Sequence, residues 1–223
     1  MASRVGGEKR DLHPSGHQEN TMRPAWPATR LPRQTFRMRI GTEAIMDTTH
    51  TAFLSVAELS RLIESKQVSP VEVTEAYLRR IDELDFKFNA YLTVCRQQAL
   101  HQAREAEAAI ARGEYLGPMH GIPVAVKDQL WSKGIRTTGG SRIMADFYPE
   151  EDATAVAKLM KAGAILLGKT NLTEFALSGS QRYSPNRNPW DLDRFTGGSS
   201  AGSGSAPALK SRIRDAACET VLD

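Results

Sequence analysis

The chain has 223 residues, of which 40% are hydrophobic and 25% charged, a balance that is ordinary for a soluble globular protein with a sizeable core. No apolar run approaches the roughly 20 residues that a membrane-spanning helix needs, which excludes a helical membrane protein. The two cysteines, Cys95 and Cys218, make no disulfide framework and suit a reducing compartment, so we expect a cytoplasmic location.

The formal net charge of +3 is not spread evenly along the chain. Residues 1–45 carry eight Lys and Arg against four Asp and Glu, whereas residues 46–223 have a balance of −1. The first segment shows little apolar periodicity and lacks the apolar core of a secretory signal. We therefore expect residues 1–48 to form a disordered basic extension, and we expect no direct nucleic-acid partner for the following domain.

Two helix starts open the domain that we expect over residues 49–206. Ser55 and Glu58 form a capping box before a stripe of apolar side chains at helical spacing. Ser69 is a second N-cap, with Pro70 at the first helical position, and its helix is expected to run to about residue 85.

A short strand and a third helix come next. Residues 89–94 have the apolar and β-branched composition of a strand. The alanine-rich segment from Gln97 to Arg112 predicts a helix, which Gly113 ends.

Two apolar segments with a helix between them predict an α/β fold. Residues 122–126 and 164–167 are continuously apolar, as strands buried on both faces are. Asp152 is expected to cap the intervening helix, which ends at Gly163. This order predicts a parallel βαβ unit, and active residues in such sheets lie beyond the carboxyl ends of the strands. Lys127 lies there, where burial would lower the pKa of its amine and make it a base.

Residues 197–205 contain four serines and four glycines. By composition alone this stretch is a flexible linker. A serine hydroxyl with a base nearby can also attack or relay a proton, and glycine lets other groups approach the backbone closely. A lysine at a strand end is more often ion-paired or solvated than catalytic, but its combination with this stretch favours a catalytic site.

The lysine segment and the Gly/Ser stretch, together with three blocks between them, resemble the amidase signature family of serine hydrolases. Order and spacing agree from about Leu54 to Ser205, roughly two-thirds of the chain. The resemblance implies an α/β fold, the N-terminal portion of a mixed, largely parallel sheet covered by helices. The matching blocks are Leu116–Asp128, Glu151–Thr154, Ala162–Phe175, Asn188–Asp191 and Gly197–Ser205.

The resemblance implies a Ser–Ser–Lys triad that hydrolyses carbon–nitrogen bonds of a small-molecule amide without metal or cofactor. Lys127 would be the neutral base, and Ser199, after a cis peptide with Gly198, would relay the proton. Ser200 would support the lysine by a hydrogen bond, and Ser203 and Ser205 would cap the backbone.

The nucleophile of the family is a further serine, on a later Gly-Gly-Ser turn that also forms the oxyanion hole. No such turn follows Ser205, and residues 207–223 diverge from the family pattern. We therefore expect a partial amidase domain with a divergent tail, which a frameshift would explain, and we expect no nucleophile and no activity in this chain.

Three functions stay open. The first is an amidase-family hydrolase of carboxamides. The second is the glutamine-hydrolysing A subunit of a tRNA-dependent amidotransferase, which would have partner subunits. The third is a non-enzymatic product of a decayed gene.

Overall fold

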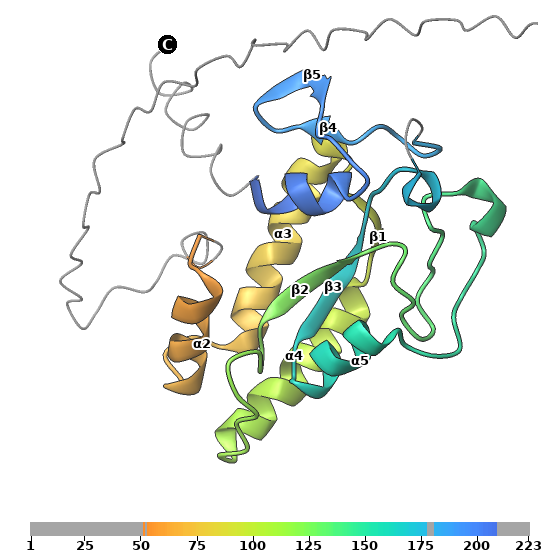
Figure 1. Cartoon of the computed structure of the whole chain (residues 1–223). Helices are drawn as coiled ribbons and strands as arrows, with labels where there is room; N and C mark the ends of the chain where they lie inside the picture. The colour runs from red at the N-terminus through yellow and green to blue at the C-terminus, as the bar shows by residue number, and fades with distance from the viewer. Residues whose placement is uncertain (1–50, 52, 178–180, 209–223) are drawn as a thin grey trace, which may run out of the picture. The chain divides into compact units, whose positions relative to one another are not determined.

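The computed structural model describes residues 51, 53–177 and 181–208 (Figure 1). Residues 1–48 and residues 209–223, for which we predicted an extension and a divergent tail, lie outside the described residues; of the predicted tail only Pro207 and Ala208 are described. The domain boundaries themselves stay predictions.

Helices α2 and α3 precede the first strand, and both have the capping box expected at Ser55 and at Ser69. Helix α2 spans Val56–Glu64, and α3 spans Pro70–Phe88, slightly longer than predicted. Ser55 and Ser69 accept hydrogen bonds from the backbone of the first turn, which satisfies amides that have no partner inside the helix. Helix α4, Arg96–Ala111, follows the short strand β1, Tyr91–Val94.

The predicted parallel unit is present in a three-stranded sheet. Strand β2, Pro123–Lys127, pairs in parallel with β3, Ile165–Thr170, and β1 pairs with β3 in the antiparallel direction, giving the order β1-β3-β2. The connection from β2 to β3 contains the short η1, Arg142–Met144, and helix α5, Thr154–Lys161. Lys127 is the last residue of β2, as expected.

Side chains of β3 alternate between two layers of helices. Ile165 and Leu167 pack with Leu78 of α3 and the alanines of α4, whereas Leu166 packs with Val156 of α5. Every residue of β3 is buried. The central strand is therefore covered on both faces, as its continuous apolar composition predicted.

Two sequence predictions about this unit are wrong. Asp152 does not cap α5: the N-cap is Ala153, without a side-chain hydrogen bond, and Asp152 Oδ1 accepts from the Lys133 backbone amide instead at 2.6 Å. Strand β2 is only half-buried over most of its length, because it pairs on one side alone among the described residues.

The C-terminal part of the described chain brings the Gly/Ser stretch against the sheet. After η2, Glu174–Ala176, strands β4, Arg187–Asn188, and β5, Asp191–Phe195, form a hairpin. Residues 201–208 are helical, and the Gly202 amide donates to the Asn171 carbonyl just beyond β3. The stretch is therefore docked on the domain and is not a free linker.

Candidate active site

Lys127 and Ser199 meet although 72 residues separate them in sequence. The Lys127 amine, Nζ, donates a hydrogen bond to Ser199 Oγ at 2.7 Å. Both side chains are half-buried. Burial lowers the pKa of the Lys127 amine below its ordinary value, because the charged form loses solvation. The contact therefore joins an amine that gives up its proton more readily than usual to a serine hydroxyl.

The backbone around Ser199 is fixed by its neighbours. The Thr173 amide donates to the Ser199 carbonyl at 3.1 Å, and the peptide bond between Gly198 and Ser199 is cis, as the resemblance implied. Gly202 lies so close to Ala90 that a Cβ there would come 2.2 Å from the Ala90 carbonyl oxygen. Only glycine fits this position, so the start of the helix over residues 201–208 is locked against the segment that follows α3.

The remaining serines of the stretch have different surroundings. Ser200 is exposed, and in the described part of the chain no hydrogen bond joins it to Lys127, so its supporting role stays a prediction. Ser203 Oγ shares a 2.8 Å hydrogen bond with Thr170 Oγ1 of β3. Ser205 Oγ donates to the Gly202 carbonyl, a backbone contact of the predicted kind.

Two asparagines that sequence reasoning missed tie this stretch to the end of α3. The Asn186 amide donates to Ser205 Oγ at 2.8 Å and to the Phe88 carbonyl at 3.0 Å. The Asn171 amide donates to the Asn89 carbonyl at 2.9 Å. Asn171 and Asn186 are almost completely buried, so these bonds replace lost hydration and hold the serine loop in place.

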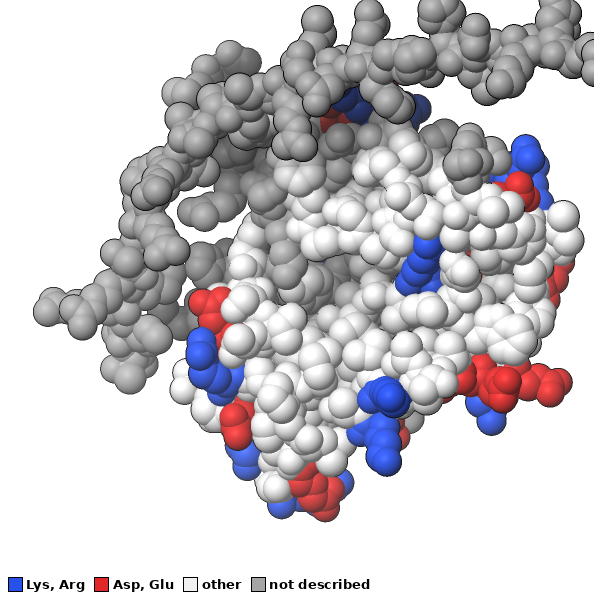
Figure 2. Space-filling view, viewed as in Figure 1, with Lys and Arg blue, Asp and Glu red and all other residues white. Residues whose placement is uncertain are grey.

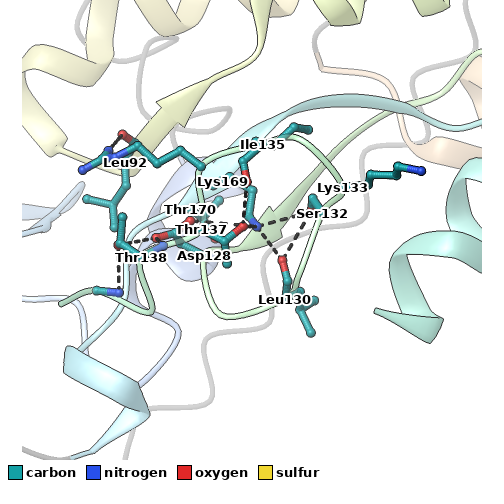
Figure 3. Close-up of polar contacts among 12 residues, drawn as sticks. Leu92, Asp128, Leu130, Ser132, Lys133, Ile135, Thr137, Thr138, Lys169 and Thr170 are labelled. Carbon is teal, nitrogen blue, oxygen red and sulfur yellow. Dashed lines mark hydrogen bonds and ion pairs between the residues drawn. The ribbon is translucent and has the colours of Figure 1, made fainter. Parts of the chain in front are cut away.

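A buried polar cluster begins at the residue after Lys127 and is shown in Figure 3. It consists of Asp128, Ser132, Thr137, Thr138 and Lys169. The Lys169 amine donates to Thr137 Oγ1 at 2.8 Å and lies 3.9 Å from Asp128 Oδ1. Burial lowers the pKa of Lys169 to about 8 and raises that of Asp128. Sequence reasoning missed Lys169 as a site residue; the signal was a lysine inside an apolar strand.

The described residues contain no group of three or more His, Cys, Asp and Glu placed to hold a metal ion, and no helix among them is long and apolar enough to cross a membrane. On the face shown in Figure 2, basic and acidic side chains are interspersed around the rim and the middle is mostly uncharged. Where the described residues are visible on this face, their basic side chains form no stripe of the kind that follows a nucleic-acid backbone.

A family model described as Amidase matches residues 72–213, more than half of the chain. The chain therefore belongs to the amidase family, which confirms the resemblance and the fold predicted with it.

The similar proteins include amidotransferase A subunits and a peptide amidase. The chain is 49% identical over 159 residues to the A subunit of glutamyl-tRNA(Gln) amidotransferase from Moorella thermoacetica, a match that covers 70% of this chain and 33% of that protein. Its counterpart from Salinispora arenicola is 51% identical, with 70% and 32% covered. The solved peptide amidase of Stenotrophomonas maltophilia is 33% identical at a TM-score of 0.63, with 68% and 33% covered. The chain thus spans about a third of these proteins.

Proposed function

We propose that this chain carries the base and the proton relay of an amidase-type hydrolase, which cleaves a carboxamide with water to a carboxylic acid and ammonia or an amine. The observation that carries the proposal is the 2.7 Å contact between Lys127 Nζ and Ser199 Oγ. The family resemblance implies that Lys127 is the base and Ser199 the proton relay, and this contact joins the two. The lowered pKa of Lys127 favours the neutral amine that a base needs.

In the proposed reaction, protons move along the lysine–serine contact. The neutral Lys127 amine takes the proton of the Ser199 hydroxyl while Ser199 takes the proton of the attacking serine. That serine attacks the amide carbonyl, and the proton returns along the same path to the leaving nitrogen. Water then releases the acid by the same steps. The attacking serine belongs to a Gly-Gly-Ser turn that the residues after Ser205 do not contain.

The experiment supplies that turn from a relative. We would join residues 46–205 to the corresponding C-terminal part of the Moorella protein and measure ammonia release from simple amides and from glutamine. Lys127→Ala should lower turnover by at least 10²-fold, because proton transfer by a positioned side chain contributes about 10²–10⁴-fold. Ser199→Ala should lower it to a similar extent without unfolding the domain.

The matched control is Lys133→Ala, which removes an exposed lysine six residues after Lys127, in the segment that follows β2, and should leave turnover unchanged. The 223-residue chain alone should release no ammonia. Lysine-dependent turnover by the short chain would contradict the relay role of Ser199, because another hydroxyl would then have to attack.

The comparisons favour glutamine as the amide, since the amidotransferase relatives are about 50% identical to this chain whereas the solved peptide amidase is 33% identical. We therefore propose an amidotransferase A subunit, working with partner subunits in the cytoplasm, as the specific form of this hydrolase. In the same assay, glutamine should then be the preferred amide and turnover should rise when the Moorella partner subunits are added. Equal hydrolysis of simple amides without those partners would favour a free-standing amidase.

A further inference from the structure

Lys169 is completely buried, yet its amine is fully supplied with hydrogen-bond acceptors (Figure 3). Nζ donates to the Leu130 carbonyl at 2.5 Å, to Ser132 Oγ at 3.2 Å and to Thr137 Oγ1 at 2.8 Å. An ammonium group has three protons to donate, and all three acceptors lie in the loop that follows β2. The side chain of one strand therefore holds the loop that leaves its neighbour.

The same loop is held from a second side by Asp128. Asp128 Oδ2 accepts hydrogen bonds from the Thr138 amide and from Thr138 Oγ1, at 2.8 and 2.5 Å. Oδ1 faces the Lys169 amine at 3.9 Å. Asp128 is also completely buried. Asp128 and Lys169 therefore hold the loop from inside the domain, and neither can reach a substrate in solvent.

This arrangement acts directly on the backbone of Lys127. The Leu130 amide donates to the Lys127 carbonyl at 2.9 Å, while the Leu130 carbonyl accepts from Lys169. The Asp128 amide donates to the Thr170 carbonyl at 3.0 Å, which fastens the same turn to β3. The turn from Lys127 to Leu130 is thereby fixed at both ends.

We propose that Lys169 is a positioning residue, which fixes the turn after Lys127 through the Leu130 carbonyl and Asp128 and so holds the Lys127 amine against Ser199. The inference rests on the proposed function, because it gives Lys169 a task only if Lys127 is the base. A buried ion pair with only a structural role would affect the stability of the domain and leave the amine of Lys127 unchanged.

The test measures the amine itself in the 223-residue chain. Acetylation of Lys127 by an N-hydroxysuccinimide ester is followed by peptide mass spectrometry between pH 7 and 11, since only the neutral amine reacts. The variants are Lys169→Met, whose unbranched side chain is one atom shorter and lacks the ammonium group, and Thr137→Val, which removes one acceptor. Ile165→Val, a buried substitution on the same strand, is the control for destabilisation.

In the wild type we expect a Lys127 pKa below 10.5, as burial of the amine requires. Loosening the turn admits water and favours the charged amine, so Lys169→Met should raise that pKa and slow labelling near pH 8 several-fold. Thr137→Val should raise the pKa of Lys127 by a smaller amount. If Lys169→Met does not fold, the result with Thr137→Val decides whether Lys169 is a positioning residue. Ile165→Val should leave the pKa of Lys127 unchanged.

The two hypotheses fail in different ways. An ordinary pKa of Lys127 in the wild type would overturn its proposed role as base. A lowered pKa that stays the same in Lys169→Met and Thr137→Val, or that shifts equally in Ile165→Val, would overturn the positioning role of Lys169 and leave the base intact.

Discussion

Two lysines near the carboxyl ends of adjacent strands have different surroundings and therefore different properties. Lys127, at the end of β2, is half-buried and faces a serine hydroxyl. Lys169, on β3, is completely buried among a carbonyl, two hydroxyls and a carboxylate. Burial lowers the pKa of both amines, but only Lys127 is placed where a reacting group could approach it.

The buried lysine should make stability depend on pH. The pKa of Lys169 is about 8 in the folded chain, whereas its ordinary value, which applies to the unfolded chain, is 10.5. Between these values the unfolded chain binds a proton that the folded chain does not, so the free energy of unfolding rises with pH, by about 1.4 kcal/mol per unit. From pH 8 to 9.5 the wild type should gain up to about 2 kcal/mol relative to Lys169→Met, measured by urea unfolding. Parallel pH dependence in the two proteins would show that Lys169 is charged in the fold.

At the scale of elements, the sequence correctly predicted those features that depend on neighbouring residues. The caps at Ser55 and Ser69 and the strand before Lys127 depend on neighbours within a few residues, and all three are present. Asp152 was predicted to cap α5, but its carboxylate accepts a hydrogen bond from the Lys133 amide, 19 residues earlier in the sequence. The role of Lys169 could not be predicted from its neighbours, since its acceptors lie 32 to 39 residues away in sequence.

The helix over residues 201–208 offers a matched pair of glycines. A Cβ on Gly202 would lie 2.2 Å from the Ala90 carbonyl oxygen and 2.5 Å from the Asn171 amide nitrogen, and neither backbone atom can move cheaply, whereas a Cβ on Gly204 would meet nothing within 4 Å. Gly202→Ala should therefore lower the free energy of unfolding by about 1–3 kcal/mol. Gly204→Ala should raise it by up to about 1 kcal/mol through helix propensity. Urea unfolding tests both, and equal effects would mean that the close approach at Gly202 does not exist in solution.

At the scale of the whole molecule, the described residues leave apolar surface accessible beside the sheet. A groove of about 270 Å³ lies between α2, α3, β2 and the helix over residues 201–208, and its walls are mainly apolar. Val56 and Ala125 belong to this lining, and among the described residues β2 has no strand on its outer side. Accessible apolar surface next to an unpaired strand edge favours association.

We therefore expect the 223-residue chain to bind the dye anilinonaphthalene sulfonate and to self-associate as its concentration rises. Ala125→Lys places a charge in the groove on the half-buried strand β2, so it should weaken dye binding several-fold and shift the chain toward the monomer. Leu116→Lys, at an exposed residue outside the groove lining, is the matched control and should change neither property. Fluorescence titration and sedimentation velocity measure the two effects. A monomeric wild type that binds no dye would mean that the groove is filled in solution, and the residues outside the described ranges would be the first to examine by crosslinking to Ala125→Cys.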